Sequence, residues 1–183
     1  MDKNNEIFEK VVLNTELEPQ LRLYRRLWIS RNDLDYAKAS IESILKSKLR
    51  YPRRKQPEHL LIALTTTLVI SYARPFVNSR GQSTTALRTV PATLLKVLTS
   101  RERSLHDGII EMRNREVAHS DAEVLELSIQ LHTSGDGGIS RATIHPLLRA
   151  DLHMLNRIID KLTNEIERLC LNLRTQLPLN VWL

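Results

Sequence analysis

The sequence predicts an all-α protein, a helical bundle of about five main helices with one appended β-hairpin. Two observations favour this class. Apolar residues recur at spacings of three and four along most of the 183 residues, which is the period of a helix with one buried face. Only the stretch near 124–145 alternates apolar and polar residues as a strand does. The length suits one domain, residues 1–183, with room for a full core.

Composition limits the class of protein and of partner. The chain has 27 Lys and Arg against 21 Asp and Glu, a net charge of +6, which favours a polyanion and nucleic acid first. The single cysteine, Cys170, excludes an internal disulfide and offers no metal-type spacing, so no metal and no other cofactor is expected. The longest apolar run, 60–73, is too short to span a bilayer, and no signal peptide is visible. We expect a cytoplasmic protein that makes no membrane contact.

The first part of the chain is predicted to hold two helices and a basic connection. Helical periodicity covers 16–48, and a break near Ser30 stays open. Segment 46–57 has six basic residues, no acid and two prolines, so it is either a phosphate-contacting loop or a solvated basic linker. Residues 58–73 are apolar on most sides and predict a central buried helix. The candidate RNA ligands in the basic segment are Arg53, Arg54 and Lys55.

The middle of the chain is predicted to be a loop, because 74–85 is rich in Pro, Asn, Gly and Ser. Arg80 in this loop is a further candidate RNA ligand. Arg74 either helps to hold RNA or caps the carbonyls at the end of the preceding helix, and the cap is the favoured reading. Pro91 is expected to open a short helix.

The last part is predicted to be a hairpin followed by the longest helix. Alternation on both sides of the turn sequence SGDGG indicates a β-hairpin over about 124–145. Pro146 is expected to open a helix over about 146–174, whose Leu and Ile residues recur as a heptad seam. That seam packs either inside the bundle or against a second copy, and packing inside is the default for a helical domain of this size.

The densest set of reactive side chains lies at 104–121, SLHDGIIEMRNREVAHSD, which reads as a helix capped by Ser104. His119 titrates near neutrality and can move a proton. Arg113 presents a planar fork of donors that suits a phosphate, and Asn114 can place a ribose hydroxyl or a phosphate oxygen. This chemistry suits a metal-free cleavage of RNA, in which a 2′-hydroxyl attacks the adjacent phosphorus.

These residues resemble the motif of the HEPN superfamily, in which an Arg and a polar residue are followed, after a short gap, by a His. Arg113, Asn114 and His119 match it, and MRNREVAHSD at 112–121 is similar to members whose motif ends in AHSD. The resemblance implies a single HEPN-like helical domain, a homodimer with the motif near its interface, and a metal-independent endoribonuclease of the toxin–antitoxin or abortive-infection kind. It also implies an antitoxin or regulatory protein as a partner. Regulation through the Tyr that some members carry two residues after the His is not implied, because Asp121 stands there.

Several alternatives stay open. On a straight α-helix Arg113 and His119 lie about 120° apart, whereas Arg115 and His119 lie about 40° apart. Either the helix ends or bends near Val117, or a second subunit completes the site, or Arg115 is the partner of His119 and an RNA contact. Some members of the superfamily are not catalytic, so the competing function is a module that binds nucleic acid or protein. The alternative without a function is that this cluster is a charged, solvated helix face. A metal shared by His106 and His119 is disfavoured, because thirteen helical residues span about 20 Å.

Overall fold

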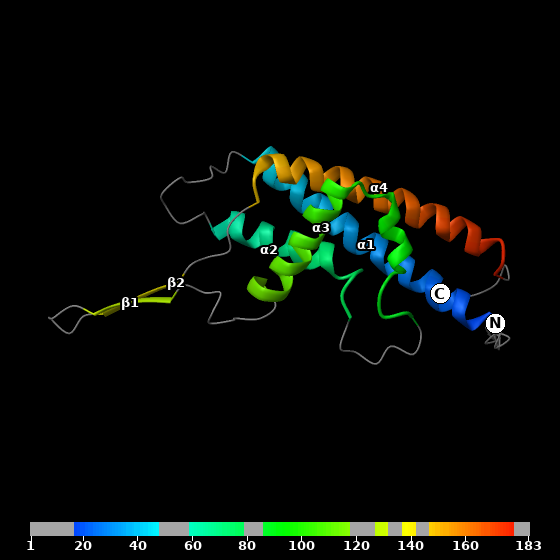
Figure 1. The fold of residues 1–183 in the computed structure, drawn as a ribbon, viewed down its shortest axis with the longest axis horizontal. Helices are drawn as coiled ribbons and strands as arrows, with labels where there is room; N and C mark the ends of the chain where they lie inside the picture. Colours follow the sequence, from blue (N-terminus) through cyan, green and yellow to red (C-terminus); the bar gives the residue numbers. More distant parts are fainter. Residues whose placement is uncertain are drawn as a thin grey trace, which may run out of the picture.

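The computed structural model describes residues 17–47, 59–78, 86–117, 127–131, 137–141 and 147–177. Figure 1 shows a helical body in which α1 and α4 run side by side. Helices α2 and α3 pack against this pair and against each other. This confirms the all-α class. The elements are α1 (Glu18–Lys46), α2 (His59–Ala73), the 3₁₀ helix η1 (Ala92–Val97), α3 (Ser100–Met112), the π-helical turn η2 (Arg113–Val117), β1 (Leu127–Leu131), β2 (Gly137–Arg141) and α4 (Arg149–Arg174).

Helix α1 is one continuous element of 29 residues, so the chain does not break near Ser30. A proline in its first turn, Pro19, suits a helix start because its missing N–H would be unpaired there anyway. Ser30 is fully buried within the helix. Helix α2 is the predicted central helix, with Leu61, Leu68 and Tyr72 fully buried. No helix in the described part of the chain is long and apolar enough to cross a membrane.

The heptad seam of α4 packs inside the chain, against α1 and the rest of the core. Its first member is the exception: Leu148 is exposed, because it is the extended N-cap residue and the helix begins only at Arg149. The predicted start at Pro146 is therefore three residues too early, and Pro146 itself lies outside the described residues. The predicted end near 174 is confirmed at Arg174. The buried seam residues are Leu152, Leu155, Ile159, Leu162 and Ile166.

Polar contacts show that α1 and α4 are antiparallel. Arg31 pairs with Glu167 at 3.0 Å and Lys38 pairs with Asp160 at 2.6 Å, so residue numbers rise along one helix as they fall along the other. The guanidinium of Arg149 donates to the carbonyl oxygen of Leu45 at 2.8 Å, near the other end of the contact. Partly exposed pairs of this kind each contribute little stability, so they mainly fix the alignment of the two helices.

A charged cluster joins the end of α2 to α1. Arg26, which is buried, donates through Nη2 to the carbonyl oxygen of Arg74 at 2.5 Å. The side chain of Arg74 donates to Asp33 on α1 at 3.3 Å. The favoured reading of Arg74 as the capping residue is therefore wrong: Arg26 caps the end of α2, and Arg74 pairs with α1. Burial lowers the pKa of Arg26 and raises the pKa of Asp33.

The strands β1 and β2 pair antiparallel, with Leu127 opposite Arg141 and Leu131 opposite Gly137. Both lie within the stretch 124–145, whose turn and flanking residues lie outside the described ranges. In Figure 1 the two strands are drawn away from the helical body. A hairpin that packs as an appended unit on the helices or on a partner stays a prediction.

We expect Leu162→Ala to lower the free energy of unfolding by about 2–5 kcal/mol, because it leaves a cavity in the seam between α4 and α1. Leu162 is 0% exposed, whereas Leu171 on the same helix is 66% exposed. Leu171→Ala is therefore the matched control and should change stability by less than about 0.5 kcal/mol. Urea denaturation of both variants measures the difference. Equal losses would show that the seam does not carry the core.

Candidate functional site

Helix α3, which leads into the motif, begins with a capping box. The N-cap residue Thr99 accepts a hydrogen bond from the backbone N–H of Glu102 at 3.4 Å, and Glu102 Oε2 accepts one from the backbone N–H of Thr99 at 2.9 Å. The predicted cap at Ser104 is wrong. Ser104 lies inside the helix, where its hydroxyl donates to the carbonyl oxygen of Ser100 at 3.1 Å. The sequence TSRE at 99–102 carries the same signal five residues earlier.

The same glutamate fastens α3 to α4. Lys161 Nζ lies 2.8 Å from each carboxylate oxygen of Glu102, and Glu102 is 8% exposed. The Lys161 ammonium, together with the N–H and hydroxyl of Thr99, lowers the pKa of Glu102. The first turn of α3 is therefore held from both sides, by its own N-cap and by the last helix.

A buried hydrogen bond fastens the middle of α3 to α2. The hydroxyl of Tyr72 lies 2.9 Å from Nδ1 of His106, and His106 is 3% exposed. The imidazole also meets the ring of Phe76 edge-on, at 4.6 Å between centroids and 89° between planes. Burial lowers the pKa of His106 to about 4 and raises the pKa of Tyr72, so both are neutral at pH 7. The sequence suggested only a disfavoured metal role for His106, and its core role depends on tertiary contacts that no local pattern encodes.

The α-helical period ends at Met112, and a π-helical turn, Arg113–Val117, follows. The backbone N–H of Arg113 contacts the carbonyl oxygens of both Ile109 and Ile110. A π-turn has more residues per turn than an α-helix, so the angles expected for a straight helix do not apply beyond Arg113. This departure from α geometry falls within the motif itself, and the turn lies against α2.

The described motif residues lie together at the end of α3. Arg113 Nη1 donates to the amide oxygen of Asn114 at 3.0 Å. Arg115 pairs with Glu111 at 3.2 Å, as spacing by four on a helix allows. Asn114 and Arg115 are exposed and Arg113 is partly exposed, so a phosphate can reach these groups from solvent. The candidate residues His119, Arg53, Arg54, Lys55 and Arg80 lie outside the described residues.

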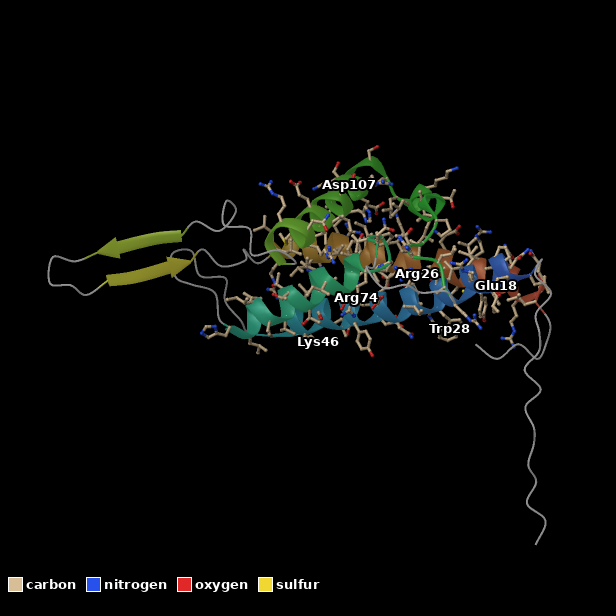
Figure 2. The ribbon with its side chains drawn as sticks, turned by 90° about the horizontal axis from the view of Figure 1, so that it is seen from below. Glu18, Arg26, Trp28, Lys46, Arg74 and Asp107 are labelled. Carbon is tan, nitrogen blue, oxygen red and sulfur yellow. The ribbon has the colours of Figure 1, made fainter. Side chains whose placement is uncertain are left out.

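Gly108 is an unexpected residue on the outward face of α3. It lies inside the helix, one turn before Glu111, and it is exposed. A Cβ added there would meet no heavy atom within 4 Å. Glycine inside a helix costs about 0.5–1 kcal/mol relative to alanine, and no contact among the described residues explains it. In Figure 2 the neighbouring residue Asp107 lies on the side of α3 that faces away from α1.

The described residues contain no group of three His, Cys, Asp or Glu side chains that could hold a metal ion. Comparisons with protein-family models, with curated proteins and with solved structures found no match to this chain.

We expect Glu102→Gln to lower the free energy of unfolding by about 1–2 kcal/mol at pH 7, because it weakens the bond to Lys161. The folded-state pKa of Glu102 is below its unfolded value. The carboxylate's contribution is therefore complete above the unfolded pKa and is lost as pH falls through the folded pKa. In acid, the free energies of unfolding of the unchanged protein and of Glu102→Gln should become equal. Urea denaturation at pH 7 and below pH 4 measures this, with Glu167→Gln, on an exposed pair with Arg31, as the control.

His106 should make the protein acid-sensitive. Its folded pKa of about 4 lies below the unfolded value of 6.5, so its contribution is complete above the unfolded pKa and is lost between these two values as pH falls. We expect stability to fall more steeply across this window in the unchanged protein than in His106→Gln. His153 is exposed, so His153→Gln should keep the original slope. A His106→Gln protein with an unchanged slope would contradict the buried, neutral imidazole.

Proposed function

We propose that this chain is a metal-independent endoribonuclease of HEPN type that serves as a defence or toxin component. The observation that carries the proposal is that the motif of Arg113, Asn114 and His119 begins where α3 leaves α geometry, at an exposed end of the helix. π-turns are rare and occur frequently at functional sites. The net charge of +6 favours a polyanionic substrate.

The proposed reaction needs only groups of the chain and the substrate. A base removes the proton of a ribose 2′-hydroxyl, the oxygen attacks the adjacent phosphorus, and the bond from phosphorus to the 5′-oxygen breaks. The leaving oxygen takes up a proton, and the products carry a 2′,3′-cyclic phosphate and a 5′-hydroxyl. His119 acts as the general base or acid. Arg113 stabilises the negative charge that builds on the phosphorus oxygens.

Two contacts support Arg113 over Arg115 as the phosphate ligand. Arg113 is bonded to a neutral amide oxygen, that of Asn114, so its charge is available to an anion. Arg115 is paired with the carboxylate of Glu111, which must be displaced before a phosphate can bind. Asn114 orients the guanidinium through its oxygen, and its amide nitrogen stays able to donate to a ribose or phosphate oxygen.

The proposal also includes the remaining expectations, some of which come from the resemblance and some from the sequence pattern. The chain is a single domain and a cytoplasmic homodimer whose motif lies near the dimer interface, and an antitoxin or regulatory protein binds it. The hairpin at 124–145 is an appended unit. The RNA-binding residues are Arg115, Arg53, Arg54, Lys55 and Arg80.

The second candidate is a HEPN-like module that binds nucleic acid or protein and performs no reaction. It is favoured by the pairing of Arg115 with the carboxylate of Glu111, which occupies one guanidinium of the motif turn within the chain. Such a module should bind RNA with strong salt dependence and form no product.

Cleavage of an end-labelled structured RNA in the presence of EDTA tests the proposal. We expect the unchanged protein to leave a 2′,3′-cyclic phosphate, and His119→Ala and Arg113→Ala each to lose about 100-fold or more in rate. Arg115→Ala should lose less than Arg113→Ala, because Arg115 is already paired. His153→Ala, at an exposed position on α4, is the control and should cleave normally.

Two results would count against the assignment. Normal cleavage by His119→Ala would show that the catalytic centre lies elsewhere. RNA binding by the unchanged protein without any product would favour the non-catalytic module. Circular dichroism and melting temperatures of all variants separate loss of activity from loss of fold.

A further inference from the structure

Three segments that carry arginines meet beside the end of α2. Arg26 on α1 donates to the carbonyl oxygen of Arg74, and Figure 2 shows these two residues where α1 and α2 meet. The backbone N–H of Leu87 donates to the carbonyl oxygen of Arg22, one turn earlier on α1, at 3.3 Å. Arg88 follows directly and is exposed. We call Arg22, Arg26, Arg74 and Arg88 the arginine group.

The positive charge of the arginine group exceeds the negative charge that the chain pairs with it. Among the residues that the structure describes, Asp33 is the one acid in an ion pair with the group, through Arg74. Arg22 and Arg26 lie four residues apart on a helix, where like charges repel. The Nε atoms of both are buried and bond to no acceptor there. Burial lowers the pKa of Arg26 although Asp33 opposes this effect, so an added anion would be stabilised beside the group.

An anion can reach the arginine group from solvent. Arg88 is exposed, Arg22 is partly exposed, and the side chain of Arg74 is 57% exposed. The contact of Arg74 with Asp33 measures 3.3 Å, which is longer than the usual range of about 2.7–2.9 Å for such a bond, so it restrains the guanidinium weakly. A guanidinium presents a planar fork of donors that matches two phosphate oxygens. The chemistry of the group therefore favours a phosphate.

The arginine group and the motif lie apart along α2. Tyr72, two residues before Arg74, is bonded to His106. Arg113 lies seven residues beyond His106, which is about 10 Å along a helix, and the motif turn still packs against α2. The two sites therefore suit separate phosphates, and one continuous RNA strand can reach both.

We propose that the arginine group is a second phosphate-binding site, which holds the backbone of the RNA strand that is cut at the motif. This inference rests on the proposed function and extends it, because it adds a contact away from the cut. Arg74 and Arg88 touch the strand, and Arg22 and Arg26 add positive charge behind them. All four are positioning residues. Contacts to phosphates fix where the strand lies without reading its sequence.

The test replaces the two exposed arginines in the full-length protein, as Arg74→Gln, Arg88→Gln and the double variant. For a single-stranded RNA that covers both sites, each replacement should reduce the salt slope of binding by about one. The double variant should lose about tenfold or more in affinity at low salt. KM for this RNA should rise while kcat is unchanged. A dinucleotide with one phosphodiester reaches only the motif, so its cleavage should be unchanged.

The matched control is Arg157→Gln, which removes the same charge at an exposed position on α4 and should keep the original salt slope. Equal losses in this control would reduce the effect to net charge and overturn the inference. Slower cleavage of the dinucleotide by folded Arg74 or Arg88 variants would overturn it too, because the group would then act through the motif. Melting temperatures check the fold, and Arg88→Gln decides alone if Arg74→Gln is unstable.

The inference and the proposed function can fail separately. Unchanged salt slopes in the Arg74 and Arg88 variants, in a protein that cuts RNA, would overturn the inference and leave the proposed function standing. Reduced slopes in the same variants, in a protein that binds RNA and forms no product, would support the phosphate site and count against the ribonuclease. If the unchanged protein neither binds nor cuts RNA, both proposals are wrong.

Discussion

The burial of one face of α4 against α1 is the constraint on which the rest of the structure depends. The two helices supply most of the apolar core, and their charged pairs fix one antiparallel alignment. That alignment sets where Lys161 lies and therefore where α3 can begin. Hydrophobic burial stabilises the pairing of the two helices, but it is non-directional and does not favour one register. The polar contacts at the edges of the pair select one register.

Three contacts of different kinds fix the position of α3, and so of the motif at its end, relative to the rest of the bundle. Lys161 holds the first turn of α3 through Glu102, Tyr72 holds the middle of the helix through His106, and α2 lies against the π-turn at its end. Each contact joins α3 to a different part of the bundle or a different level of the helix. Arg113 and Asn114 therefore extend from a helix whose rotation and axial position are both fixed, which is the rigid support that their proposed role requires.

The sequence predicted well those helices whose apolar residues recur at helical spacing. Helices α1, α2 and α4 follow from apolar spacing, and the intramolecular seam follows from the size of the domain. The N-terminus of α3 was misplaced because Thr99 and Ser104 are both followed three residues later by an acid. The capping box favours Glu at that place, so Thr99 with Glu102 is the better match, and Lys161 adds a tertiary contact to Glu102. The roles of Arg26 and His106 depend on partners far away in the sequence, which no local pattern encodes. Within the motif, the sequence singled out Arg113, Asn114 and Arg115, but it could not predict which side chain each of them contacts.

The antiparallel pairing of the first and last helices has a consequence for how the protein is made. Lys38 and Asp160 are separated by 122 positions along the chain, so the contacts between α1 and α4 join segments that are distant in sequence. Contacts of this kind form late, because a long loop must close before they can contribute. During synthesis α1 can pack against α2 first, but the apolar surface of α1 that meets α4 stays uncovered until α4 leaves the ribosome. A chain with this topology completes its core, and fully orders the helix that bears its motif, only after α4 has been synthesised.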